Sequence, residues 1–233
     1  MGGYLALPSN GTPRAAIIVA HELFGVSPDI RGVVDRLATL GYAALAPEFY
    51  HRTAQPGEWL ERTDAGRARG FQELNRLTRD GVVEDVRASL DYLRALPGIS
   101  SRVGMLGFSM GGHIAYLAAT QLDLSATAVL YGGWLASTDI PLSQPNPTLD
   151  LTPGIASHGG RLLYLVGGRD HLIDSAQVTL IRSALQAAAV PHDFVVYPEA
   201  VHAFFWPNTP AFHEQSRDAA WQALREFFER TLT

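Results

Sequence analysis

The chain has 233 residues, 47% hydrophobic and 18% charged, a composition that predicts one globular domain over residues 1–233. A net charge of −5 without a run of Lys or Arg argues against a nucleic-acid partner, and the lack of cysteine excludes disulfides, a thiolate nucleophile and cysteine-ligated zinc. The sequence opens without a secretory-type leader and holds no apolar run of membrane-spanning length, so we expect a cytoplasmic monomer or homodimer with no membrane partner.

Short apolar runs alternate with helical patterns along the chain. Six runs predict strands buried on both faces, at residues 15–20, 42–46, 103–108, 126–131, 162–166 and 194–197. Apolar residues at three- and four-residue spacing predict helices within 82–93, 178–185 and 220–228. This alternation predicts an α/β fold with a mostly parallel, doubly wound sheet flanked by helices.

Two segments break this rhythm, residues 50–70 and residues 132–160. Both follow predicted strands, and the second is rich in Gly, Pro, Ser and Thr. Ligands in open α/β sheets bind at the carboxyl ends of the strands, so these segments are candidates for the walls of a substrate pocket. Tolerated surface insertions would give the same pattern.

A Gly-x-Ser-x-Gly sequence at residues 107–111 centres on Ser109. It follows the predicted strand 103–108 and precedes an apolar helical run from Gly112, which is the strand–turn–helix context of a nucleophile elbow in the α/β-hydrolase fold. The two glycines give the clearance that such a tight turn needs. A helix-capping serine would explain Ser109 but leaves the paired glycines unexplained.

A serine nucleophile needs a histidine base and an acid that orients the base, and in this fold they follow in the order Ser, Asp or Glu, His. His202 follows the last predicted strand and precedes the last helix, where the base belongs. Asp170 follows the strand at 162–166 and is favoured as the acid. Its rival Asp174 is better explained as a helix cap.

The tetrahedral oxyanion formed in acyl transfer needs two hydrogen-bond donors. One is expected from the N–H of Met110, directly after the nucleophile, and the other from the N–H of Leu23, in the loop after the first predicted strand. Glu22 in the same loop is unexpected, because a carboxylate near Ser109 would repel the oxyanion unless it is paired or protonated. An ordinary loop carboxylate with an Arg partner is the simpler interpretation. No spacing of metal ligands appears, so no metal or cofactor is predicted.

Five motifs together resemble those of the dienelactone hydrolase family over nearly the whole chain. They lie at residues 21–25, 41–50, 104–112, 167–171 and 197–204. The resemblance implies that Asp170 is the acid and His202 the base, that Glu22 is functional, and that Arg67, with Arg69 close by, binds a substrate carboxylate.

The chain departs from the family pattern at two positions. The best-known members carry a cysteine where this chain has Ser109, which leaves the purpose of Glu22 open. Trp206 stands where a further carboxylate-binding arginine is expected. We therefore expect a more apolar pocket, formed by Trp206, Phe204 and Trp134 unless these side chains belong to the core.

The sequence thus predicts a serine hydrolase that cleaves a small ester or lactone through an acyl-enzyme on Ser109. An amidase or peptidase of the same fold has the same catalytic parts and is the first alternative. A ligand-binding protein without catalysis is a weaker one, since it has no need of a nucleophile, a base and an acid in this order.

Overall fold

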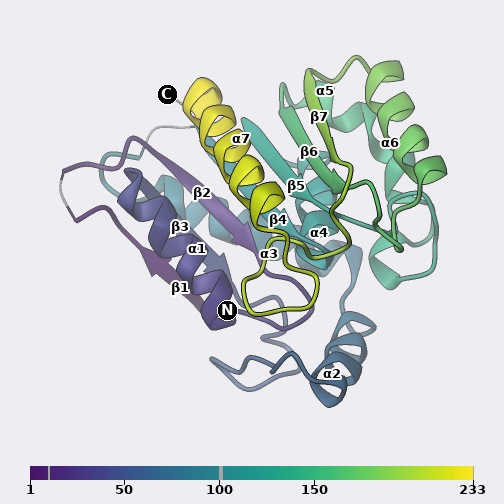
Figure 1. Ribbon diagram of the computed structural model, residues 1–233. Coiled ribbons are helices and arrows are strands. Elements are labelled where there is room, and N and C mark those ends of the chain that lie inside the picture. Colours follow the sequence, from purple (N-terminus) through teal and green to yellow (C-terminus); the bar gives the residue numbers. More distant parts are fainter. Residues whose placement is uncertain (10, 100–101, 233) are drawn as a thin grey trace.

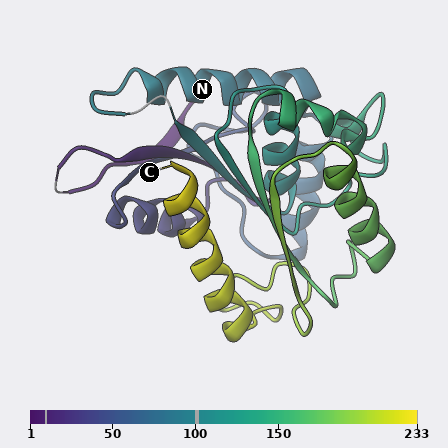
Figure 2. The same ribbon diagram turned by 90° about the horizontal axis from the view of Figure 1, so that it is seen from above.

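The computed structural model describes residues 1–9, 11–99 and 102–232, which form a seven-stranded sheet with helices on both faces (Figures 1 and 2). The strand order is β1-β3-β2-β4-β5-β6-β7. β1 pairs antiparallel with β3, and all other neighbouring strands are parallel. The predicted α/β fold with a mostly parallel, doubly wound sheet is therefore confirmed.

The strands are β1 (Gly3–Ala6), β2 (Ala15–Ala20), β3 (Tyr42–Pro47), β4 (Val103–Phe108), β5 (Ala126–Leu130), β6 (Arg161–Gly167) and β7 (His192–Tyr197). The α-helices are α1 (Pro28–Thr39), α2 (Asp64–Leu74), α3 (Arg79–Arg94), α4 (Met110–Ala119), α5 (Pro153–Ser157), α6 (Ser175–Ala187) and α7 (Glu214–Leu232). Two 3₁₀ turns are η1 (Pro141–Ser143) and η2 (Thr148–Leu151). No described helix combines the length and apolarity needed to cross a membrane.

The central strands are apolar because helices cover both of their faces. Every residue of β2 has 0% exposure, as expected for a strand between two helical layers. α1 and α7 contact one side of the sheet, and α3 and α4 contact the other (Figures 1 and 2). On α3, the buried residues Val82, Val86, Leu90 and Leu93 form the apolar stripe that the sequence predicted.

Outside segment 132–160, three elements lie where no strand or helix was predicted. β1 adds an edge strand, and α1 follows β2 behind an N-cap in which the Ser27 hydroxyl accepts from the N–H of Ile30 at 3.5 Å. α2 begins at Asp64, inside the segment 50–70 that was expected to be irregular, and the hydroxyl of Thr63 caps it.

Segment 132–160 is longer than an ordinary loop but is ordered. It carries η1, η2 and α5, and the Arg79 side chain donates to the carbonyls of Leu142 (3.0 Å) and Asn146 (2.7 Å). The buried ring of His113 joins the carbonyl of Gly133 (2.8 Å) to the hydroxyl of Thr148 (2.9 Å). These contacts tie the segment to α3 and α4.

The chain order reverses between β2 and β4, because β3 lies on one side of β2 while β5, β6 and β7 follow on the far side of β4. Such a switch point is where open α/β sheets bind ligands. The loops after β2 and β4 therefore meet at the sheet edge where a functional site is expected.

Candidate active site

Ser109 occupies a strained turn between β4 and α4. Its backbone angles are φ 52° and ψ −114°, in a region that residues with a Cβ rarely adopt. A Cβ on Gly107 would lie 2.0 Å from the carbonyl oxygen of Gly111, and one on Gly111 would lie 2.2 Å from that of Ala20. The Ser109 hydroxyl makes no cap to α4, so a helix-capping role does not account for this residue.

Ser109, His202 and Asp170 form one hydrogen-bonded chain. Ser109 Oγ lies 2.9 Å from His202 Nε2, and His202 Nδ1 lies 2.9 Å from Asp170 Oδ2. A carboxylate only accepts, so Nδ1 carries the proton and Nε2 is left to accept from the serine hydroxyl. The Asp170 side chain is fully buried and that of His202 is 11% exposed.

The second oxygen of Asp170 is held by the backbone that follows it. Asp170 Oδ1 accepts from the N–H groups of Leu172 (2.9 Å) and Ile173 (3.1 Å), which fixes the carboxylate behind His202. Asp174 lies elsewhere: its Oδ1 accepts from the N–H of Gln177 at 2.8 Å as the N-cap of α6. The geometry thus distinguishes the two acids in the way that the sequence favoured.

The loop after β2 lies directly against the turn that carries Ser109. A Cβ on Gly111 would meet the carbonyl oxygen of His21 at 2.5 Å, so the start of this loop touches the first turn of α4. The loop turns back where the N–H of Gly25 donates to Glu22 O at 3.2 Å. It brings half-buried Leu23 into the neighbourhood of Met110, which is fully buried at the start of α4.

Glu22 is buried, with 3% exposure, and has two partners that are distant in sequence. Arg62 Nη1 forms an ion pair with Glu22 Oε1, and the indole N–H of Trp206 donates to Oε2 at 2.8 Å. Burial raises the pKa of the Glu22 carboxyl, and Arg62 and the Trp206 N–H oppose that shift. The Arg partner expected for Glu22 is thus Arg62, which sequence spacing did not single out.

Arg62 is itself shared between two carboxylates. Its Nη2 and Nε lie 3.0 and 3.3 Å from Asp29 Oδ2, in addition to the ion pair with Glu22. The guanidinium also lies over the rings of Phe24 and Trp206, 5.1 Å from each centroid. Its positive charge is therefore already matched within the protein.

The two arginines expected to bind substrate lie on α2. Arg67 is exposed, whereas Arg69 Nε donates to Glu73 Oε1 at 2.6 Å. Buried Glu73 also accepts from Arg76 and Thr53. Within the described ranges, neither Arg67 nor Arg69 pairs with Glu22.

The aromatic residues expected at the pocket differ in burial. Phe204 has 0% exposure and packs against Tyr131 and Tyr197, with ring centroids 5.5 and 5.3 Å away. Trp206 is 2% exposed, so it lies beneath the site as a donor to Glu22 and is not an open wall. Trp134 follows β5 with a φ of 58° and is half-buried, because it packs against the core.

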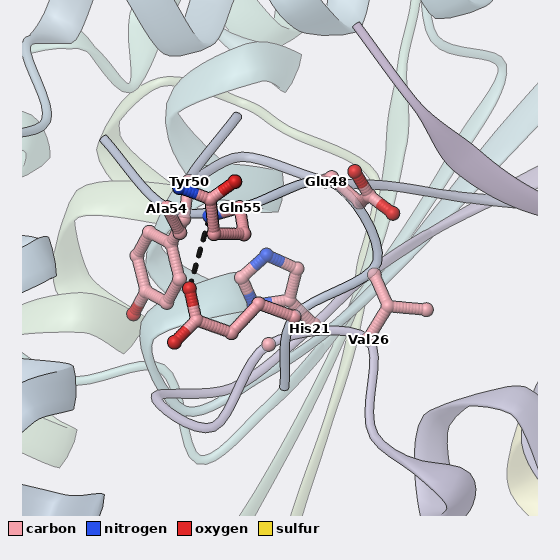
Figure 3. A pocket seen from close by; sticks show the side chains of 8 residues that line it. His21, Val26, Glu48, Tyr50, Ala54 and Gln55 are labelled. Carbon is pink, nitrogen blue, oxygen red and sulfur yellow. Dashed lines mark hydrogen bonds between the residues drawn. The ribbon is translucent and has the colours of Figure 1, made fainter. Parts of the chain in front are cut away.

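A small pocket lies behind the loop after β2 (Figure 3). It is lined by His21, Gly25, Val26, Glu48, Tyr50, Ala54, Gln55 and Glu58. Neither Ser109 nor His202 contributes to it. In the described part of the chain, no three His, Asp or Glu side chains come together as a metal site.

Comparison with known proteins gives consistent results. The family model "Dienelactone hydrolase family" matches residues 1–232. A Synechocystis protein named "Putative carboxymethylenebutenolidase" is 32% identical over 237 residues, which is 100% of this chain and 92% of that protein. A crystal structure named "Putative Dienelactone Hydrolase", from Klebsiella pneumoniae subsp. pneumoniae, has a TM-score of 0.86 at 31% identity and covers 98% of this chain and 92% of its own. Est1E from Butyrivibrio proteoclasticus shares the fold at 16% identity, with a TM-score of 0.69 over 99% of this chain and 93% of its own.

Proposed function

Since this chain belongs to the dienelactone hydrolase family, we propose that it is a serine hydrolase that cleaves a small ester or lactone through an acyl-enzyme on Ser109. The observation that carries the proposal is the hydrogen-bonded chain from Ser109 through His202 to Asp170. It supplies a nucleophile, a base with a free acceptor nitrogen, and an acid that holds the tautomer of the base.

The proposed reaction has two halves that use the same groups. His202 Nε2 takes the proton of Ser109 Oγ as the oxygen attacks the carbonyl carbon, and the N–H groups of Leu23 and Met110 stabilise the oxyanion. The C–O bond to the leaving alcohol breaks as His202 returns the proton to that oxygen. Water then loses a proton to His202, attacks the acyl-enzyme and releases the acid, and Ser109 regains its proton. No cofactor is required.

We propose an acyl group without a negative charge. Arg62 is matched by Glu22 and Asp29, Arg69 is paired with Glu73, and Trp206 replaces an expected arginine. Of the residues expected to bind a carboxylate, Arg67 alone is exposed and, among the described residues, makes no ion pair. Cytoplasmic location, a single domain, a monomeric or dimeric state and the lack of nucleic-acid and membrane partners stay predictions from sequence.

The proposal is tested by a fluorophosphonate probe and a substrate panel of neutral aryl esters, lactones, dicarboxylate half-esters and aminoacyl amides. Ser109→Ala should abolish labelling and lower kcat by about 10⁴- to 10⁶-fold on the best substrate. Neutral esters should give the highest kcat/KM. Faster cleavage of amides would favour a peptidase, and folded wild-type protein that neither labels nor hydrolyses would favour a ligand-binding protein.

A further inference from the structure

The peptide between Glu22 and Leu23 carries the N–H proposed to bind the oxyanion, and the carbonyl of that peptide is restrained. Glu22 O accepts from His21 Nδ1 at 2.7 Å and from the N–H of Gly25 at 3.2 Å. In a trans peptide the C=O and the following N–H point in opposite directions. The direction of Glu22 O therefore sets the direction of Leu23 N–H.

The ring of His21 is in turn held by the segment after β3. His21 Nε2 accepts from the N–H of Phe49 at 3.3 Å, and the ring packs near those of Phe49 and Tyr50, with centroids 5.4 and 5.0 Å away. Burial lowers the pKa of His21 to about 4, so the ring is neutral at pH 7. In the tautomer with the proton on Nδ1, Nδ1 donates to Glu22 O and Nε2 accepts from the N–H of Phe49, so both nitrogens are satisfied.

Tyr50 restrains Leu23 from its other side, at its carbonyl group. Its hydroxyl donates to Leu23 O at 3.1 Å and lies 3.2 Å from Met110 Sδ. Both carbonyls that flank Leu23 N–H are thus fixed by side chains, and one hydroxyl contacts the two residues whose N–H groups are the proposed oxyanion donors. Tyr50 is 6% exposed, so no water competes for most of its surface.

The pocket of Figure 3 lies beside these two rings. His21 and Tyr50 both face it, so the loop is not held there by close packing alone. The loop is also paired with the segment after β3, where the N–H of Leu60 donates to Phe24 O at 2.9 Å, but among these contacts only those of His21 and Tyr50 reach the carbonyls on either side of Leu23 N–H.

We propose that His21 and Tyr50 are positioning residues that hold Leu23 N–H and Met110 N–H in the geometry of an oxyanion hole. The inference rests on the proposed hydrolase function. Neither side chain touches the reacting atoms. His21 acts through the carbonyl of Glu22, and Tyr50 acts through the carbonyl of Leu23 and the thioether of Met110. Loss of either restraint lets the donors move away from the oxyanion, and small displacements of catalytic groups are costly.

The sharpest test removes one oxygen atom. Tyr50→Phe keeps the ring but loses the contacts to Leu23 O and Met110 Sδ. With an aryl butyrate ester, we expect kcat per fluorophosphonate-titrated site to fall about 10-fold while KM changes little. The Ki of the corresponding trifluoromethyl ketone, whose adduct places an oxyanion in the same hole, should rise by the same factor. Tyr116→Phe is the matched control, since it removes another buried hydroxyl, which lies 2.7 Å from Thr152 Oγ1.

A second pair of variants tests His21 by rescue. His21→Leu removes the donor to Glu22 O and should lower kcat per titrated site by about 10²-fold. His21→Asn places an amide N–H near the position of Nδ1 and should restore most of that loss. A role in folding alone would lower the melting temperature and the titrated fraction but leave kcat per site and Ki unchanged.

The outcomes separate the two proposals. If wild-type protein shows Ser109-dependent hydrolysis while Tyr50→Phe and His21→Leu stay within twofold of it in kcat per site and Ki, the positioning role is wrong and the hydrolase proposal stands. If Tyr50→Phe does not fold, the His21→Asn and His21→Leu comparison decides the matter. If wild-type protein has no Ser109-dependent activity, both proposals fail.

Discussion

Two buried carboxylates lie close to Ser109, and they are held in different ways. Asp170 accepts hydrogen bonds from His202 and from two backbone N–H groups of its own turn. Glu22 is held by Arg62 and Trp206, which lie 40 and 184 residues away in the chain. Asp170 is therefore held partly by the backbone of its own turn, whereas Glu22 is held by side chains that only the tertiary fold brings to it.

The difference bears on how a negative charge could be accommodated beside the proposed oxyanion. Asp170 contacts Nδ1 of His202, on the side of the ring away from Ser109, so its charge acts on the proposed base. Glu22 lies in the loop that supplies a proposed oxyanion donor, where an unmatched charge would oppose catalysis. Two effects limit that charge in different ways: burial raises the pKa of Glu22 and so favours its neutral form, whereas Arg62 opposes this shift and balances the charge of the ionised form.

Removing the charge of the first carboxylate should have the largest effect. In Asp170→Asn, an amide N–H₂ can face His202 Nδ1 in place of a carboxylate oxygen. This disfavours the tautomer with the proton on Nδ1, which the reaction needs, so we expect kcat/KM for an aryl ester to fall about 10⁴-fold. Asp174→Asn is the matched control, because Asn is also a good N-cap and α6 should be retained. A larger loss of activity in Asp174→Asn would mean that the acid has been misassigned.

Breaking the ion pair of the second carboxylate should act mainly on stability. Arg62→Met leaves Glu22 buried with Trp206 as its remaining partner, and we expect the free energy of unfolding in urea at pH 8 to fall by about 3 kcal/mol. The double variant Glu22→Gln/Arg62→Met should recover most of the loss, because no unpaired charge remains. An equal loss in the double variant would show that Arg62 stabilises the fold by its packing on Phe24 and Trp206.

The smallest expected effect is on the pH dependence of stability. The folded-state pKa of Glu22 is raised, so the folded chain holds this proton more tightly than the unfolded chain, and the resulting stability is lost as pH rises through the folded pKa. Glu22→Gln keeps a neutral side chain at every pH. Its melting temperature should therefore rise relative to wild type between pH 5 and pH 8. A difference that stays flat or falls over this range would contradict the raised pKa.

Ser109, Asp170 and His202 could be predicted from the sequence, because the fold places such residues in a fixed order along the chain. Ser109 lies in a motif with a local steric cause, and Asp170 and His202 each follow a buried strand. Their catalytic roles stay a prediction, but the structure brings the three side chains together. Six strands were also recognisable. Five of them leave continuous apolar runs because they are buried on both faces, whereas β7 lies at the sheet edge and is only partly buried, contrary to the expectation for residues 194–197.

The remaining features depend on contacts that have no local signal. β1 is four residues long and is defined by its antiparallel pairing with residues 44–47, so its own sequence carries no alternation to detect. Arg62 is one of several arginines after β3, and only the fold shows that it reaches Glu22. α1 is different, because it does carry a local signal: Ser27 and Pro28 form a standard helix start.

The backbone of Ser109 links the proposed activity to the stability of the fold. A residue with a side chain at φ 52° and ψ −114° stores strain that the rest of the fold must offset, whereas glycine tolerates that conformation freely. Glycine at position 109 would thus relax the turn and at the same time remove the proposed nucleophile. The proposed nucleophile therefore lowers the stability of the fold that carries it, so a more stable variant at this position would be an inactive one.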